Sequence, residues 1–154
     1  MSNSLAPMAH FLTNLRIPLR LACKTKSGWP MAVSLWYLYD DGHLFCATQQ
    51  SARVISYLEH DSRCAFEISA DLPPYCGVRG QAIARIDHEL GAEILEQLLI
   101  RYLGDTDNQL ATLLLAKSKT EVAVVLEPKR IFSWDFTQRM SDISFDHPTE
   151  KICP

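Results

Sequence analysis

The stretch LFCATQQSARVISYLEHDSR, residues 44–63, decides the fold and carries the clearest sign of a ligand site. It begins as an apolar strand that ends at Thr48, and after a short polar turn the pattern predicts a helix that opens at Ser51. Ser51 is a good N-cap, because its hydroxyl can accept from free amides of the first helical turn. Those amides, the helix dipole and the side chain of Arg53 favour an anion at this end of the helix. The stretch therefore predicts either a phosphate site or an ordinary capped helix with no ligand.

Two arginines bring positive charge to this stretch. Guanidinium groups suit bidentate contacts to phosphate, so Arg53 and Arg63 are both candidate phosphate ligands. For Arg63, neutralisation of the neighbouring Asp61 explains the charge equally well.

Composition excludes several classes of protein. The chain has 154 residues, of which 47% are hydrophobic, so it predicts one domain with a packed core. Its formal net charge is -3 and its pI is about 5.9, which argues against a nucleic-acid-binding barrel. No apolar run approaches the roughly 20 residues of a membrane helix, and the first residues lack the pattern of a signal peptide. We therefore expect a soluble, cytoplasmic protein.

The cysteines and histidines show no metal-ligand spacing. The cysteines are odd in number and form no CxxC pair; Cys46 and Cys64 lie in apolar strand patterns and are expected to be small buried hydrophobes, as is Cys76. Cys153, in the terminal KICP, is expected to be an exposed thiol. We predict no metal site.

The rest of the chain alternates short apolar runs with turn signals. Asp40-Asp41-Gly42 is typical of a tight hairpin, and Lys26-Ser27-Gly28 is typical of a turn. Helices are expected over 7–15, 51–60, 87–103 and 108–116, and strands over 17–25, 29–39, 43–48, 63–70, 75–86, 120–127 and 130–136. The first three strands are expected to form a meander. Because strands mostly follow one another and GxGxxG is absent, the pattern favours a closed antiparallel barrel with helical inserts over a Rossmann fold.

In this order, four segments resemble the FMN-binding split-barrel family, the pyridoxamine 5'-phosphate oxidase-like proteins. The segments are SGWPMAVSLWYLYDDGHLFCAT (27–48), SARVISYLEHDSRCAFEIS (51–69), YCGVRGQAIARI (75–86) and EPKRIFSWDF (127–136). The resemblance spans about residues 8–140 and implies a mainly β split barrel, antiparallel and Greek-key-like, with six to seven strands and helical connections. It implies one domain over 1–154 with an irregular tail over 141–154, and a homodimer with FMN at the interface.

The resemblance also implies which residues hold the cofactor. The flavin phosphate would lie at the turn and helix after the third strand, and the ring would lie along the second strand. The C-terminal aromatic, contributed by the partner subunit, would close the site. The implied cofactor-binding residues are Val33, Ser34, Leu35, Trp36, Ala47, Thr48, Gln49, Ser51, Arg53, Tyr75, Trp134 and Arg139.

Simpler roles are open for several of these residues. Ser34 is equally explained as a core hydroxyl, and Tyr75 as a residue that packs in its turn. Trp29, Trp36 and Trp134 are most simply core or dimer-interface residues.

The sequence departs from the oxidase itself in ways that argue against pyridoxamine phosphate as the substrate. The oxidase has consecutive Ser-Arg-Lys in the phosphate turn, whereas this chain has Ser51-Ala52-Arg53. It also has an Arg and a Lys on the second strand, where this chain has Ala32 and Tyr37.

No catalytic triad or carboxylate pair is evident, and a flavin enzyme needs neither, because the cofactor carries the hydride chemistry. The sequence therefore predicts an FMN-dependent oxidoreductase that acts on a small unknown substrate. The alternatives are a non-catalytic flavin-binding module and a haem- or deazaflavin-binding member of the same fold. For haem, His147 is the most plausible axial ligand by position.

Overall fold

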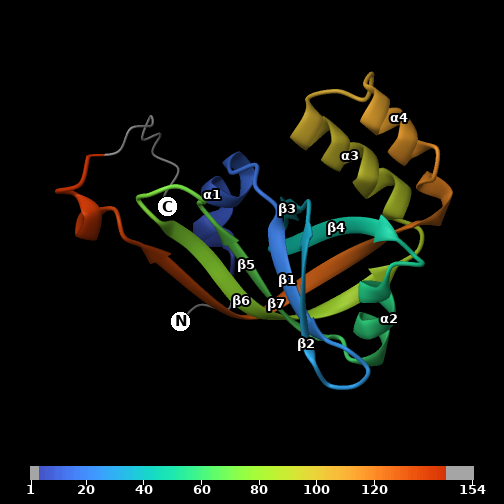
Figure 1. Ribbon diagram of the computed structural model, residues 1–154, viewed down its shortest axis with the longest axis horizontal. Coiled ribbons are helices and arrows are strands. Elements are labelled where there is room, and N and C mark those ends of the chain that lie inside the picture. The colour runs from blue at the N-terminus through green and yellow to red at the C-terminus, as the bar shows by residue number, and fades with distance from the viewer. Residues whose placement is uncertain (1–3, 145–154) are drawn as a thin grey trace.

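The computed structural model describes residues 4–144 and contains one seven-stranded antiparallel sheet in the order β2-β1-β5-β6-β7-β4-β3 (Figure 1). The strands are β1 (Leu19–Lys24), β2 (Pro30–Leu35), β3 (Leu38–Asp40), β4 (His43–Gln49), β5 (Arg63–Ser69), β6 (Cys76–Asp87) and β7 (Glu121–Asp135). The α-helices are α1 (Ala9–Asn14), α2 (Arg53–His60), α3 (Gly91–Leu103) and α4 (Gln109–Leu115). Short 3-10 turns are η1 (Ala6–Met8), η2 (Ser118–Thr120) and η3 (Gln138–Met140). The mainly β split-barrel fold predicted from the sequence is confirmed.

The sheet curls around an apolar interior because its strands alternate buried and open residues. On β1 the buried side chains are Leu19, Leu21 and Cys23, and Phe66 and Ile68 lie opposite them on β5. This period of two is what the strand geometry requires of a sheet with one buried face. The residues between them face outwards and form a second surface.

Helix α3 covers the other side of β4 and β7. The first six residues of β7, from Glu121 to Leu126, are buried on both faces of the strand. Val122 and Val124 face the barrel interior, whereas Ala123 and Val125 pack against α3. Figure 1 shows α3 and α4 together at one end of the molecule, outside the sheet.

The strand predicted over 29–39 is wrong, because two aromatic residues interrupt it. Trp36 stacks on Tyr102 of α3. The next residue, Tyr37, is fully buried, and its hydroxyl donates to the carbonyl oxygens of Leu12 and Leu15 at 2.9 and 3.1 Å. The chain therefore leaves β2 and re-enters the sheet as β3 at the opposite edge, so the predicted meander is also wrong.

Conversely, the strands predicted over 120–127 and 130–136 are one strand. β7 continues through Pro128 because its pairing with β6 shifts there: Ala82 lies opposite Pro128, whereas Gln81 lies opposite Arg130. This β-bulge accommodates a residue without an N–H, and proline within sheets is confined to such places.

The predicted turns are confirmed. In the β3–β4 hairpin, Asp41 and Gly42 have φ values of 41° and 80°, the combination that a type I′ turn requires. In the β1–β2 hairpin, Gly28 has φ 88°. Within residues 4–144, no helix is long and apolar enough to cross a membrane.

Candidate functional site

The barrel is split between two strand edges that pair with no other strand of the described residues. β2 is hydrogen-bonded only to β1, and β4 beyond Phe45 only to β7. The two strands approach each other across the split without pairing. Half of the predicted cofactor-binding residues border this split, namely Val33, Ser34 and Leu35 on β2 and Ala47, Thr48 and Gln49 on β4.

The hydrogen-bonding pattern shows which backbone groups the split exposes. Hydrogen-bonded and non-bonded residue pairs alternate along antiparallel strands. The amide of Thr25 donates to the carbonyl of Trp29 at 2.8 Å, which marks a bonded pair. Counted from there, Ala32 and Ser34 are in non-bonded pairs with β1, so their N–H and C=O groups face the open edge. Ala47 faces the split in the same way, counted from the bond between Gln50 and Thr120.

The helix at one end of the split is not capped by a side chain. α2 begins at Arg53, and its N-cap is Ala52. Ser51 is exposed, and the prediction that its hydroxyl caps the helix is wrong, because the helix starts two residues later than the sequence pattern indicates. Among residues 4–144, no side chain caps the first-turn amides of α2, although the amide of Ile55 donates to the carbonyl of Ala52 at 3.0 Å.

Arg53 and Arg63 have different surroundings. Arg63 donates twice to the carboxylate of Asp61, at 2.9 and 2.8 Å, so its charge is neutralised as the simpler explanation predicted. Arg53 is exposed and forms no salt bridge and no side-chain hydrogen bond within residues 4–144. Of these two arginines, Arg53 alone is available to an external anion.

The end of β4 is held by a polar cluster. The side-chain oxygen of Gln49 accepts from the Thr120 hydroxyl at 2.5 Å, and the side-chain nitrogen donates to the carbonyl of Lys117 at 3.3 Å. Opposite Gln49 in the β4–β7 register lies Glu121, which is 6% exposed, and burial raises the pKa of its carboxyl group. The contacts of Gln49 fix the point where the chain turns from β4 into α2. Thr48 is half-buried next to it.

The ring of Trp36 is engaged in packing rather than open to the split. It stacks on Tyr102 and contacts the apolar clusters between α3 and the sheet. Ala47 packs against the same clusters. The open groups at this end of β2 are therefore mainly backbone groups.

Tyr75, Trp134 and Arg139 lie at the other end of the molecule. Tyr75 is exposed, and its carbonyl accepts from the amide of Phe136. The guanidinium of Arg79 lies 5.5 Å from the centre of the Trp134 ring, and that of Arg139 lies 5.7 Å from the ring of Phe136.

A single chain does not bring these residues to the split. Gly77 pairs with Trp134, and Ile83 pairs with Arg63 just after α2. Six residues of extended strand separate the two positions, which is about 20 Å at about 3.3 Å per residue. Figure 1 likewise shows α2 and the C-terminal end of β7 at opposite ends of the molecule.

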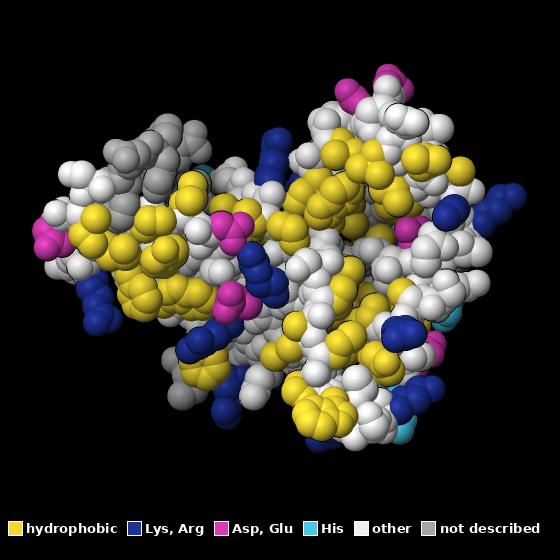
Figure 2. Space-filling model, viewed as in Figure 1, with side chains coloured by type: hydrophobic (Ala, Val, Ile, Leu, Met, Phe, Trp, Pro, Cys, Tyr) yellow, Lys and Arg dark blue, Asp and Glu magenta, His cyan; other side chains and the backbone are white. Residues whose placement is uncertain are grey.

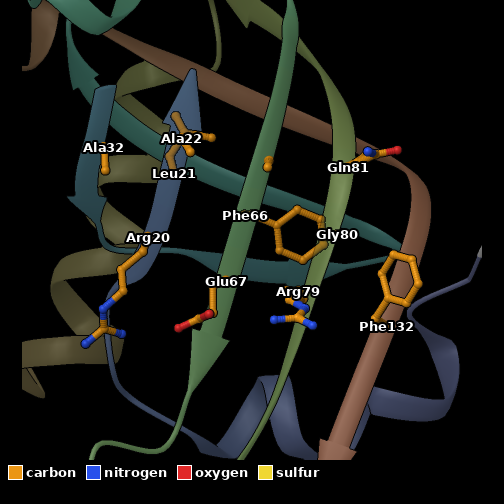
Figure 3. Close-up of a pocket in the computed structure, with 11 residues that line it drawn as sticks. Arg20, Leu21, Ala22, Ala32, Phe66, Glu67, Arg79, Gly80, Gln81 and Phe132 are labelled. Carbon is orange, nitrogen blue, oxygen red and sulfur yellow. The ribbon is translucent and has the colours of Figure 1, made fainter. Parts of the chain in front are cut away.

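The outward face of the sheet carries a groove that sequence analysis missed. Its cavity volume is about 410 Å³. In register across the strands, one row runs Ala32–Ala22–Ala65–Gln81, and the next runs Ser34–Arg20–Glu67–Arg79–Phe132. Figure 3 shows that Arg20, Glu67 and Arg79 lie along one side of this groove. The outward alternation of small and charged residues on β1 and β5 was the available signal.

Partners hold two of these charges in place. Arg20 donates to Asp71 at 2.8 Å, and Glu67 accepts from the hydroxyl of Ser69 at 3.0 Å. Exposed apolar side chains continue the surface beyond the groove; Figure 2 shows them gathered over the C-terminal end of β7 and over α3 and α4.

The described residues offer no group of His, Cys, Asp and Glu side chains that would hold a metal ion. Cys46 and Cys64 are buried thiols, as predicted, whereas Cys76 is buried but disulfide-bonded. The predictions for His147 and Cys153 fall outside the described residues.

No model of a protein family and no curated protein sequence matches the chain. Solved structures do match it. Rv2991, a conserved hypothetical protein from Mycobacterium tuberculosis, has a TM-score of 0.75 and 22% identity, covering 98% of this chain and 94% of that one. An F420 reductase has a TM-score of 0.68 and 15% identity, covering 86% and 98%. A protein from Listeria innocua, provisionally assigned as a pyridoxamine 5'-phosphate oxidase, has a TM-score of 0.64 and 14% identity, covering 83% and 95%.

Proteins described as haem-binding or haem-storing also have this architecture. At these identities the likeness concerns the fold, and cofactor and activity differ among the neighbours. The chain therefore has the split-barrel fold of the pyridoxamine 5'-phosphate oxidase-like proteins.

Proposed function

We propose that this chain binds FMN in the split between β2 and β4, that two copies form a homodimer around the flavins, and that the dimer is an oxidoreductase acting on a small substrate. The observation that carries the proposal is the combination of two unpaired strand edges with an uncapped helix terminus at one end of them.

α2 and Arg53 support the proposed position of the flavin phosphate. Unoccupied amides at a helix N-terminus and a nearby guanidinium attract an anion, through both the helix dipole and charge-assisted hydrogen bonds. Arg53 has no carboxylate partner in the described part of the chain, so binding would not require an ion pair to break.

The open edge of β2 supports the proposed position of the isoalloxazine ring. The edge of an isoalloxazine ring presents both hydrogen-bond donors and acceptors, and a strand edge offers both kinds of group. Ala32 and Ser34 supply such groups from β2. The hydroxyl of Ser34, which is exposed rather than part of the core, adds a further donor and acceptor.

A homodimer is supported by the separation of the two groups of predicted residues. Trp134 is about 20 Å along β6 from the residue that follows α2 of its own chain, and Tyr75 precedes the same end of β6, so a second copy would supply them. The groove and the row of alanines on the outward face give this second copy a shallow surface on which to pack.

When bound, FMN would supply hydride transfer. The residues of this chain would bind the phosphate through Arg53, orient the ring edge through the backbone of β2, and exclude water through the indole of Trp134 from the partner subunit. Along β2 and from Cys46 to Gln49 of β4, the described residues include no His and no carboxylate, so these two strand edges would bind and position the flavin.

Flavin binding by two arginine variants tests the site. We expect Arg53→Ala to weaken FMN binding by about ten-fold or more, because a hydrogen bond to a charged group contributes about 1.5–3 kcal/mol. Arg16→Ala is the matched control, because Arg16 is also exposed and has no salt bridge in the described residues, but precedes β1. Titration followed by quenching of flavin fluorescence measures both affinities. Equal affinity in the two variants would place the phosphate elsewhere.

A deazaflavin is the second candidate, because a solved structure with this fold, at TM-score 0.68, is an F420 reductase. The same titration with F420 separates the candidates. Tighter binding of F420 than of FMN would favour the deazaflavin.

Bound FMN that no reduced nicotinamide nucleotide reduces would favour a flavin-binding module without turnover.

A further inference from the structure

Two buried thiols lie opposite each other on neighbouring strands of the barrel. In the antiparallel register of β1 with β5, Arg20 pairs with Glu67, Leu21 with Phe66 and Ala22 with Ala65. The next position along this register places Cys23 opposite Cys64. Both are free thiols on the inward face, 5% and 8% exposed.

The hydrogen bonds of β1 with β2, and of β5 with β6, show whether Cys23 and Cys64 take the place of a hydrogen-bonded or a non-hydrogen-bonded pair. Cys23 is in a bonded pair with Met31 of β2, counted from the bond between Thr25 and Trp29, so its backbone faces away from β5. Cys64 is in a bonded pair with Ala82 of β6, counted from the bond between Ala84 and Ser62, so its backbone faces away from β1. In this register the two cysteines take the place of a non-hydrogen-bonded pair, whose opposite Cα atoms are about 4.5 Å apart in a regular ladder, one residue beyond the last paired position of β1 and β5.

A disulfide spans about 4.4–6.8 Å between Cα atoms, so it can bridge this pair at the ladder spacing and also where the strands begin to separate. The electrostatic environment agrees with the proximity: burial raises the pKa of the Cys64 thiol to about 12, and Cys23 contributes a smaller rise. The Cys64 thiol also donates to the carbonyl of Ala82 at 3.5 Å.

A cavity of about 580 Å³ adjoins the two cysteine positions from the outward face of the sheet. Cys23 and Cys64 both line it, together with residues of β6 and β7, and it lies where the pairing of β1 with β5 stops after Ala22 and Ala65. Cys46, the third free thiol of the described residues, is fully buried and does not line this cavity.

We propose that Cys23 and Cys64 form a redox-active dithiol, which a small oxidant such as a hydroperoxide converts to a disulfide between β1 and β5. The Cys23 thiolate attacks a peroxide oxygen, and the O–O bond breaks to give a sulfenic acid and, after protonation, water. The Cys64 sulfur then attacks the sulfenic sulfur, its proton leaves with the hydroxyl group as a second water, and the S–S bond forms. Two thiols lose two electrons, and hydrogen peroxide is reduced to two waters.

The disulfide would fasten the end of the sheet at which the two strands part. Its formation would be slow at neutral pH, because few buried thiols with a raised pKa are ionised there. The site does not depend on the proposed flavin.

Peptide mapping of the folded wild-type chain tests the pairing. The protein is treated with hydrogen peroxide, its remaining thiols are alkylated in denaturant, and it is digested with trypsin and an enzyme that cleaves after glutamate. Cleavage after Arg63, Glu67 and Arg79 separates Cys64 from Cys76, so the linked peptides can be assigned. We expect a peptide that joins 21–24 to 64–67.

Three variants sharpen the test. Cys23→Ser and Cys64→Ser should abolish this linked peptide, whereas Cys46→Ser, a substitution of another buried thiol of the same barrel, should retain it. Recovery of both thiols as alkylated peptides from peroxide-treated wild type would overturn the proposal. So would a link between Cys64 and Cys46 in place of Cys23.

Discussion

The ring of Trp36 stacks on the ring of Tyr102, with centroids 4.9 Å apart and an interplanar angle of 6°. One residue belongs to the break between β2 and β3, and the other to α3, so the contact joins the split edge of the barrel to the helical insert. The hydroxyl of Tyr102 also donates to the carbonyl of Ile17 at 3.0 Å. Trp36 is therefore a packing residue that holds the end of β2 in place.

Removal of this indole should destabilise the fold. We expect Trp36→Ala to lower the free energy of unfolding by about 3 kcal/mol, the low end for loss of a large aromatic side chain, because Trp36 is only partly buried. In a double-mutant cycle with Tyr102→Ala, the coupling should be about 0.5–1.5 kcal/mol. Urea unfolding of the four proteins gives both values, and additive effects would show that the rings do not interact.

Gly80 lets β5, β6 and β7 lie close together. A Cβ atom at this position would lie 2.6 Å from the carbonyl oxygen of Arg130 and 2.7 Å from the ring of Phe66. Gly80→Ala should therefore cost about 1–3 kcal/mol of stability, because backbone and a buried ring would have to move. Gly42→Asn is the control, since nothing lies within 4 Å there and asparagine tolerates its positive φ. Equal thermal stability of the two variants would contradict this packing.

Asp61, the residue after α2, links β1 and β5 through its carboxylate. Hydrogen bonds from Arg63 and Lys24 hold the pKa of Asp61 well below its usual range. Because the folded-state pKa is lowered, the stabilisation is complete above the unfolded pKa of about 3.9 and is lost as the pH falls below it. We expect Asp61→Asn to lower the melting temperature at pH 7, and the difference from wild type to shrink below about pH 4. A difference that stayed constant down to pH 3 would show that the ion pairs do not cause it.

The proposed dimer predicts an effect of charge at the centre of the outward face. Ala22 is exposed and pairs with Ala32 and Ala65 in the row of small residues. Ala22→Arg should convert the dimer to a monomer with an unchanged circular dichroism spectrum, because a large charged side chain would separate the two surfaces. Ala92→Arg, at an exposed position on α3, should remain a dimer. Light scattering after gel filtration measures the mass, and a dimeric Ala22→Arg variant would exclude this face.

Local patterns were enough to predict most elements of the fold. The Asp41-Gly42 dipeptide predicts a tight turn by itself, and both residues have the positive φ that the turn needs. Asn108 caps α4 by accepting from the amide of Ala111, close to where the sequence predicted the start of that helix. The order of these elements, together with the four resembling segments, was sufficient for the split barrel.

Contacts between distant segments determine the features that local sequence patterns did not predict. Tyr37 turns inwards because the carbonyls of Leu12 and Leu15 lie within reach, and nothing local to residues 29–39 signals this. Likewise, Arg20, Glu67 and Arg79 come together only through the register of three strands, as do Cys23 and Cys64. Serine at position 51 is compatible with a cap, but the structure begins the helix at Arg53.

The proposed flavin site can be tested by the visible absorption spectrum of the purified protein, recorded before and after titration with FMN and then with a reduced nicotinamide nucleotide. We expect saturable uptake of FMN, with flavin bands that bleach on reduction. A Soret band would instead identify a haem protein, and the absence of both chromophore and FMN uptake would contradict a flavin site between β2 and β4.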